Sequence, residues 1–245
     1  MIRKIFAFTL SRFAALLGYK LIPANSRMLQ KPALDLVIET LRADGVTSPV
    51  VFDVGANIGQ SIERLLGKIP QASIHAFEPG LMAFKTLTEK WGRNEHVSML
   101  QIALGASDGE AVLNENQEST MSSFYELGQA GWGKVEASHT VKMSTLDKYC
   151  EERQLHRLDL LKSDTQGYDL SVLQGAEKMI LKKGIRIICL ELIFCEIYVG
   201  MPPYHEVLRW LSERGYHLVA ITDSHYQDGR LGWADAIFSP ANSQL

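Results

Sequence analysis

The chain has 245 residues, 46% hydrophobic and 22% charged, which is typical of one large globular domain and not of a disordered or repetitive chain. Its net charge of −3 and pI near 6.2 lack the basic character of a nucleic-acid-binding domain. We therefore expect a small-molecule or saccharide substrate and no nucleic-acid partner. Three cysteines without a C-x-x-C pair predict reduced thiols in a cytoplasmic protein.

Residues 1–47 differ in composition from the rest and predict an N-terminal helical extension, followed by a catalytic domain at 48–245. In segment 1–22 the apolar residues fall roughly on one helical face. We interpret the segment as a helix packed on the catalytic domain, with peripheral contact at the inner face of a membrane as the alternative. A spanning helix needs about 20 apolar residues, and Ser11-Arg12 interrupts this run too early.

From about Ser48 the sequence alternates short apolar runs with helical patterns, which indicates an α/β fold with a parallel sheet covered by helices. The predicted strands are 50–54, 73–77, 97–102, 158–163, 185–190, 217–221 and 234–238. The predicted helices are 60–66, 81–91, 168–181 and 204–214.

The interval 105–143 breaks this alternation and is rich in Gly, Ser, Asn and Glu. It is too long for a simple connection, so we expect extra short strands, a substrate-covering loop, or both. Next, Ser144 followed three residues later by Asp147 resembles a capping box. This pattern predicts a helix from Thr145 to about Glu152.

The first predicted strand runs into a glycine-containing turn, FDVGANIGQ at 52–60, that opens a helix. Free N–H groups at a helix N-terminus suit an anionic or zwitterionic ligand. Dinucleotide sites need G-x-G-x-x-G to seat a pyrophosphate, but Asn57 and Gln60 replace the second and third glycines here. The remaining D-x-G-x-x-x-G pattern favours S-adenosylmethionine (SAM).

Several further motifs follow in order. They are HAFEP at 75–79, ALGASDG at 103–109, TLD at 145–147, LLKSDTQGYDLSVLQGA at 160–176 and GMPPYHEVLRWLSERGY at 200–216. With these motifs the sequence resembles the FkbM family of SAM-dependent methyltransferases over roughly residues 50–240. The resemblance implies a Rossmann-like class I fold with seven strands, the last antiparallel, and helices on both faces. It also implies O-methylation of a hydroxyl on a saccharide, glycolipid or related natural product.

The expected cofactor site combines the turn with the ends of the neighbouring strands. Asp53 would reach the amino group of the methionine moiety directly or through water, or else only hold the turn. Asn57 tolerates the left-handed backbone that a glycine would otherwise supply, and Glu78 should accept both ribose hydroxyls. The resemblance implies that Ala103 and Leu104 line the adenine. The predicted cofactor-binding residues are Asp53, Gly55, Ala56, Asn57, Gly59, Glu78, Pro79, Ala103, Leu104 and Asp164.

Methyl transfer to a hydroxyl is helped by a base within hydrogen-bond reach. Asp164 is the first candidate because it follows the fourth strand, at the edge of the sheet where ligands bind in α/β proteins. Glu191 is the second, since a charge directly after an apolar strand is hard to explain by packing. His205 is the third, although it would also suit the exposed start of a helix.

The interval from Met121 to His139 is expected to form part of the acceptor site, because aromatic surface with hydroxyls suits a sugar face, and Tyr204 is expected to border it. The predicted acceptor-binding residues are Ser122, Ser123, Phe124, Trp132 and Tyr204. Metal dependence stays open: Asp164, Asp169 and Glu191 could hold a divalent cation, but no spacing requires it, and Asp169 could instead cap a helix. A non-catalytic SAM-binding protein is an alternative function, and an NAD-dependent oxidoreductase is disfavoured by the glycine spacing.

Overall fold

The computed structural model describes residues 31–241. The segment 1–22, for which membrane contact was considered, lies outside these residues. Within 31–241, none of the helices combines the length and apolar composition that crossing a membrane requires. The three cysteines carry free thiols.

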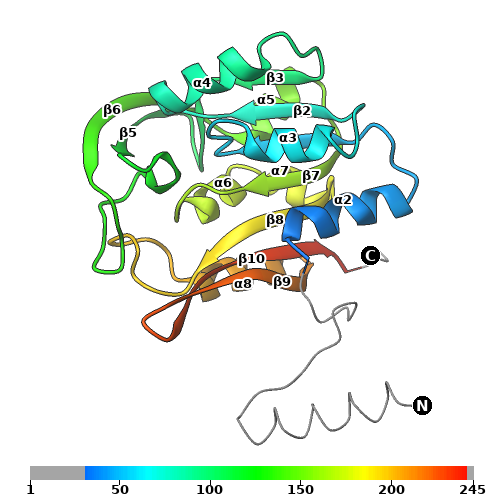
Figure 1. Ribbon diagram of the computed structural model, residues 1–245. Helices are drawn as coiled ribbons and strands as arrows, with labels where there is room; N and C mark the ends of the chain where they lie inside the picture. Colours follow the sequence, from blue (N-terminus) through cyan, green and yellow to red (C-terminus); the bar gives the residue numbers. More distant parts are fainter. Residues whose placement is uncertain (1–30, 242–245) are drawn as a thin grey trace, which may run out of the picture. The chain divides into compact units, whose positions relative to one another are not determined.

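A seven-stranded sheet forms the centre of the domain, in the order β3-β2-β1-β7-β8-β10-β9 (Figure 1). Its strands are β1 (Val50–Val54), β2 (Ser73–Phe77), β3 (Val97–Leu100), β7 (Leu158–Ser163), β8 (Ile185–Ile193), β9 (Tyr216–Gln227) and β10 (Arg230–Pro240). The first five of these pair in parallel, and β10 runs antiparallel to β8 and β9. The expected seven-stranded, mostly parallel sheet with an antiparallel last strand is confirmed.

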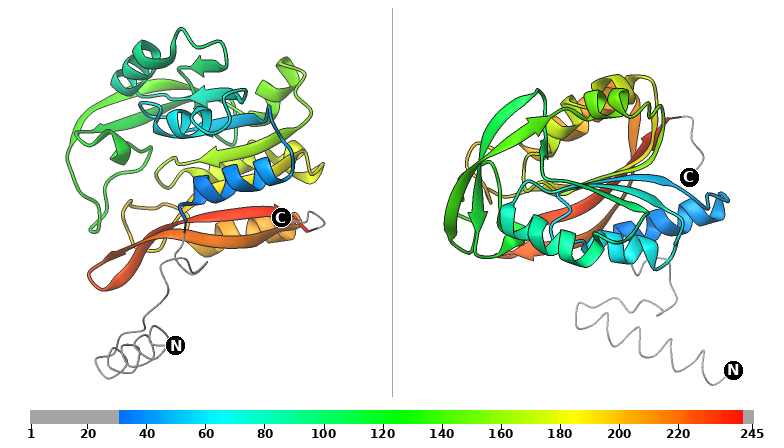
Figure 2. Two further views of the ribbon diagram at one scale, coloured as in Figure 1. Left: turned by 45° about the vertical axis from the view of Figure 1, so that its right-hand side comes forward. Right: turned by 90° about the horizontal axis from the view of Figure 1, so that it is seen from above.

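Helices cover both faces of the sheet, as the right-hand view of Figure 2 shows. Because side chains alternate along a strand, Val51 packs into the layer of α2 (Ala33–Ala43), α3 (Gln60–Leu66) and α4 (Leu81–Trp91). Its neighbour Phe52 packs on the opposite side, in the layer of α5 (Leu146–Glu152), α6 (Asp169–Gln174), α7 (Glu177–Leu181) and α8 (Tyr204–Glu213). The buried side chains around Val51 and those around Phe52 therefore form two hydrophobic cores, one on each face of the sheet.

Helix α2 falls inside the stretch predicted as an N-terminal extension. Its buried residues Val37, Ile38 and Leu41 belong to the same core cluster as Val51. The helix begins where the backbone N–H of Ala33 donates to Asp223 Oδ2 at 2.7 Å. Helix α2 therefore shares a core with the sheet.

The interval 105–143 contains the extra strands expected for it. Strands β5 (Gly109–Asn116) and β6 (Val135–Ser144) form a second sheet with β4 (Ala103–Leu104) in the order β4-β6-β5, and the 3-10 turn η1 (Ser119–Met121) follows β5. Ala103 and Leu104 form a strand separate from β3, and this strand pairs in parallel with β6. The substrate-covering loop stays a prediction.

Two local predictions were wrong. The helix predicted at 168–181 is two helices, α6 and α7, separated at Gly175, where a Cβ would lie 2.0 Å from the carbonyl oxygen of Gly105. The cap of α5 is Thr145 and not Ser144, since Thr145 Oγ1 accepts from the Lys148 N–H at 3.2 Å. Asp147 instead caps α7, accepting the N–H groups of Lys178 and Met179 at 2.7 and 3.0 Å.

Candidate active site

A cavity of about 210 Å³ lies at the carboxyl ends of the parallel strands. This edge of a parallel sheet is where ligands bind in open α/β proteins. The residues that line it include Gly55, Ala56, Asn57, Glu78, Pro79, Ala103, Leu104, Ser119, Thr120, Ser122, Ser123, Phe124, Lys162, Asp164, Thr165 and Gln166. The fold thus gathers most of the predicted cofactor-binding residues around one hollow.

The turn after β1 uses left-handed backbone at three positions: Gly55 (φ 76°), Asn57 (φ 49°) and Gly59 (φ 88°). Asn57 adopts the conformation predicted for it. A Cβ on Gly55 would lie 2.0 Å from the Asp164 carbonyl oxygen, and one on Gly59 would lie 2.4 Å from Trp91 Nε1. Both glycines are therefore required by contacts within the protein, and Gly59 does not line the cavity.

Glu78 directly follows β2 and holds the turn across the sheet edge. Its Oε2 accepts the Asn57 N–H at 2.8 Å, and its Oε1 accepts the Gly80 N–H at 2.8 Å. Burial raises the pKa of Glu78 to about 7, although the two backbone hydrogen bonds oppose the shift. Each oxygen still has a lone pair for a hydroxyl donor in the cavity.

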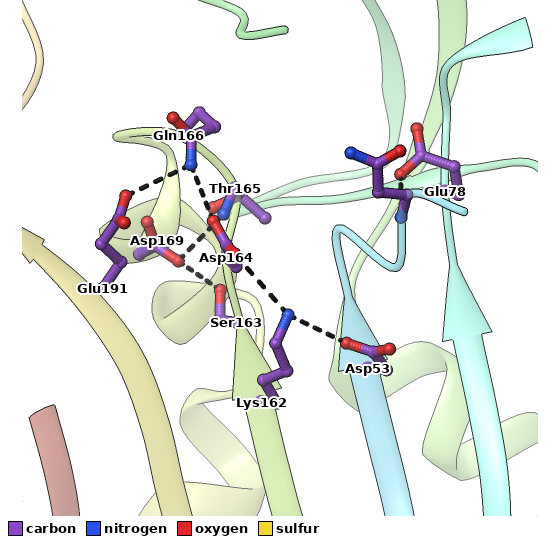
Figure 3. A network of polar contacts seen from close by, with 10 residues as sticks. Asp53, Glu78, Lys162, Ser163, Asp164, Thr165, Gln166, Asp169 and Glu191 are labelled. Carbon is purple, nitrogen blue, oxygen red and sulfur yellow. Dashed lines mark hydrogen bonds and ion pairs between the residues drawn. The ribbon is translucent and has the colours of Figure 1, made fainter. Parts of the chain in front are cut away.

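Asp53 and Lys162 are cross-strand partners in the parallel pairing of β1 with β7. The Lys162 ammonium lies 3.1 Å from Asp53 Oδ1 and 3.8 Å from Asp164 Oδ2 (Figure 3). Burial disfavours the charged ammonium, but the two carboxylates outweigh burial and raise the pKa of Lys162. Asp53 is fully buried and does not line the cavity, so Lys162 stands between it and the hollow.

Asp164 and Glu191 are joined by the side chain of Gln166 (Figure 3). Gln166 Nε2 donates to Asp164 Oδ1 at 2.8 Å and to Glu191 Oε2 at 3.2 Å, and the hydroxyl of Tyr198 donates to Gln166 Oε1 at 2.8 Å. Burial, followed by the nearby carboxylates of Asp164 and Asp169, raises the pKa of Glu191 well above its usual range. Asp164 is far more accessible, with 42% of its side chain exposed.

Asp169 takes a structural position at the start of α6. Its Oδ1 accepts the Ser163 hydroxyl at 2.5 Å and the Thr165 N–H at 3.4 Å. Burial raises the pKa of Asp169 to about 6 despite these bonds. In residues 31–241 no group of three or more His, Cys, Asp or Glu side chains has the geometry to hold a metal ion, so Asp164, Asp169 and Glu191 do not form such a group.

The segment after β5 forms the wall opposite the sheet. Ser119 Oγ donates to Asn57 Oδ1 at 3.1 Å, and Ser123 Oγ donates to the carbonyl oxygen of Gln166 at 2.7 Å. Phe124 packs against Tyr168 with ring centroids 4.7 Å apart. The predicted acceptor residues Ser122, Ser123 and Phe124 therefore share one cavity with the cofactor-binding residues.

Three other predicted residues lie away from this cavity. Trp132 packs on Trp233, with centroids 5.2 Å apart, and Tyr204 packs on Phe194 at 4.8 Å. Tyr204 lines a smaller hollow with Glu191 and Asp169. His205 is exposed at the start of α8 and lines neither hollow.

The sequence reasoning overlooked Lys162, Gln166 and Tyr198. The sequence did indicate Lys162. Side chains two positions apart along a strand point to the same side, so Lys162 was expected on the side of the sheet that Asp164 faces. Nothing local indicated Tyr198, which follows β8 and reaches Gln166 only through the folded chain.

The sequence profile of the Methyltransferase FkbM domain matches residues 53–218, which include the turn after β1, Glu78 and the Asp164–Gln166 turn. The chain belongs to the FkbM methyltransferase family. As a member of this family it is a SAM-dependent methyltransferase.

Relatives of this FkbM protein include two named methyltransferases. It is 27% identical over 183 residues to 2-O-methyltransferase NoeI from Sinorhizobium fredii, covering 70% of the chain and 74% of that protein. It is 28% identical over 180 residues to hexuronic acid methyltransferase AglP from Haloferax volcanii, covering 72% and 67%.

Solved structures agree on the fold alone. An rRNA methylase from Streptococcus thermophilus superposes with a TM-score of 0.50 at 12% identity, covering 86% of the chain and 98% of that structure. A fibrillarin/Nop5p complex gives a TM-score of 0.50 at 15% identity, covering 79% and 73%.

The residues of the cavity fit SAM. Glu78 offers acceptor lone pairs for a ribose, and Ala103 and Leu104 offer buried apolar surface for an adenine. Thr165 Oγ1 is buried beside them and has no hydrogen-bond partner among residues 31–241, so it offers a further polar contact.

Proposed function

We propose that this protein methylates a hydroxyl group of a saccharide. The observation that carries the proposal is the placement of the Asp164 carboxylate in the wall of a cavity that also carries a row of side-chain hydroxyls. These hydroxyls belong to Ser119, Thr120, Ser122 and Ser123. Ser119 and Ser123 donate within the protein, but a hydroxyl oxygen has two lone pairs and can also accept from a substrate with several hydroxyls of its own.

Two relatives support the two parts of the proposal. NoeI is named as a 2-O-methyltransferase, which matches methylation of a hydroxyl, and AglP is named as a hexuronic acid methyltransferase, which matches a saccharide acceptor. Each match spans at least two thirds of both chains.

When bound, SAM supplies a methyl group whose carbon–sulfur bonding electrons stay on sulfur as the methyl group moves to the acceptor oxygen. Asp164 would accept the hydroxyl proton as the new carbon–oxygen bond forms. Gln166 fixes the direction of the carboxylate by donating to Oδ1, and Lys162 stabilises its negative charge from the other side. Phe124 and Leu104 add apolar surface to the wall of the same cavity.

Asp164 is a better base than Glu191 in this arrangement. Its side chain is accessible from the cavity, whereas the raised pKa of Glu191 keeps that carboxyl protonated over more of the neutral range. Glu191 would act indirectly, because it shares the Gln166 amide with Asp164.

The substrate class can be tested with methyl-tritiated SAM and a panel of defined methyl glycosides of hexoses, 6-deoxyhexoses and hexuronic acids. Retention of label in a glycoside after mild alkali would show an ether on a hydroxyl. Release as methanol would instead show an ester on a hexuronic acid carboxyl and would contradict the proposal.

The role of Asp164 is tested by Asp164→Asn, which keeps an oxygen for Gln166 but cannot accept a proton. We expect kcat to fall about 10²–10⁴-fold while S-adenosylhomocysteine (SAH) still binds. Asp108→Asn is the matched control, since Asp108 lies on an exposed turn and pairs with Lys148 at 2.8 Å. Near wild-type turnover by Asp164→Asn would exclude Asp164 as the base.

A further inference from the structure

The charges on the cavity wall are unequal. Glu78 and Asp164 supply acidic groups, whereas Lys162 is the only lysine or arginine among the residues within 31–241 that line this hollow. SAM carries two cationic groups, the sulfonium and the α-ammonium, and one anionic group, the α-carboxylate. One cation on the wall therefore faces a ligand with one anion.

We propose that Lys162 binds the α-carboxylate of the methionyl group of SAM, and that Asp53 positions the Lys162 ammonium without touching the cofactor. The inference rests on the cofactor and is independent of the acceptor proposed above. It assigns Asp53 a role different from the contact with the methionyl amino group expected from the sequence.

The geometry of the ammonium leaves donors for a ligand. An ammonium has three N–H donors. Asp53 Oδ1 forms an ion pair with the ammonium at 3.1 Å, while Asp164 Oδ2 at 3.8 Å lies beyond hydrogen-bond distance. The Lys162 side chain retains 16% exposure, and it lines the cavity.

Asp53 is placed to orient this ammonium. It is fully buried on β1, next to Lys162 in the strand register, and is not part of the cavity wall. The side chains of Asp53 and Lys162 form an ion pair (Figure 3), and Lys162 is the member of the pair that lines the cavity. A partly buried ammonium interacts more strongly with an anion than an exposed one, because the surrounding dielectric constant is low.

The test compares two ligands on two proteins by calorimetry. The ligands are SAH and its decarboxylated analogue, 5′-deoxy-5′-(3-aminopropylthio)adenosine, and the proteins are wild type and Lys162→Met. Wild type should bind the analogue about ten- to one-hundredfold more weakly than SAH, the range of one hydrogen bond to a charged group. Lys162→Met should bind both ligands with the same affinity, within about twofold, because its apolar side chain cannot contact the carboxylate.

The wild-type comparison tests whether the α-carboxylate contributes to binding, and the variant assigns that contribution to Lys162. If Lys162→Met does not fold, Asp53→Asn combined with Lys162→Met removes both charges of the buried pair and serves as the second variant. Lys148→Met is the matched control on an exposed lysine. Equal binding of the two ligands by wild type, or an undiminished preference for SAH in Lys162→Met, would overturn the proposal.

Discussion

Glu78 Oε2 accepts the backbone N–H of Asn57 at 2.8 Å, so the carboxylate that follows β2 holds the turn that follows the neighbouring strand β1. The same carboxylate faces the cavity, and burial raises its pKa to about 7. The ionised form has the greater number of acceptor lone pairs for ribose hydroxyls. The affinity for SAH should therefore depend on pH through Glu78.

We predict that SAH affinity falls about tenfold as the pH is lowered from 8 to 6, because the ionised fraction of Glu78 falls by about that factor around a pKa near 7. Glu78→Gln should bind more weakly at pH 8 and show little pH dependence in calorimetric titrations. Glu89→Gln is the control, since Glu89 is exposed on α4 and is not among the charges that raise the pKa of Glu78. A flat pH profile for wild type would contradict the assignment.

Gln166→Glu is predicted to lower kcat about ten- to one-hundredfold. The substitution replaces the N–H donor to Asp164 and Glu191 by a third carboxylate, so Asp164 loses the contact that fixes its direction and gains a like charge beside it. Steady-state kinetics with saturating SAM measure the loss. Gln154→Glu is a matched control, because Gln154 is exposed and has the same left-handed backbone as Gln166 (φ 54° and 52°). Wild-type turnover by Gln166→Glu would show that the amide does not position the base.

Asp235→Asn should stabilise the protein at alkaline pH. Burial, with the nearby carboxylates of Asp164 and Asp223, raises the pKa of Asp235 to about 7. The folded state therefore retains a proton that the unfolded chain releases near pH 4, and stability falls as the pH rises from about 4 to 7. Asparagine resembles the protonated form, and its N–H can donate to Asp223.

At pH 8 the free energy of unfolding of Asp235→Asn should exceed that of wild type by about 1 kcal/mol or more. In thermal melts each kcal/mol raises the melting temperature by about 2–4 °C. At pH 4 the two melting temperatures should converge. Asp228→Asn in the hairpin turn is the control and should follow wild type at both pH values. A constant difference between Asp235→Asn and wild type would rule out titration as the cause.

Asp147→Ala is predicted to lower the free energy of unfolding by about 1–2 kcal/mol, because it uncaps two N–H groups of α7. Urea denaturation measures this loss. Glu151→Ala, an exposed position on the same helix, controls for changes in α5 itself. SAH affinity should remain at the wild-type value in both variants, because neither residue lines the cavity. A loss of affinity would connect α5 to the site.

The strand bounds of β1, β2 and β7 match the sequence prediction, because each strand has apolar residues at most of its buried positions and is followed by a polar or glycine residue. Largely buried parallel strands produce this pattern. The sheet edge then brings Glu78 and Asp164 into one cavity, as their positions after strands predicted.

Long-range contacts account for what the sequence did not reveal. Trp132 packs on Trp233 because the chain around it pairs through Leu127 with Tyr198, a bridge between segments distant in sequence. The break between α6 and α7 likewise depends on the approach of Gly105 to Gly175. Local periodicity carries no information about either contact.

The parallel pairing of β1 with β7 places Val51 beside Leu160, and everything between them must be synthesised before the two strands can meet. A nascent chain that has produced β1, β2 and the turn between β1 and α3 still lacks Lys162, Asp164 and Gln166. Such a chain cannot form the cofactor cavity, so it cannot yet gain stability from the cofactor. A nascent chain should therefore bind SAM only after β7 has paired with β1.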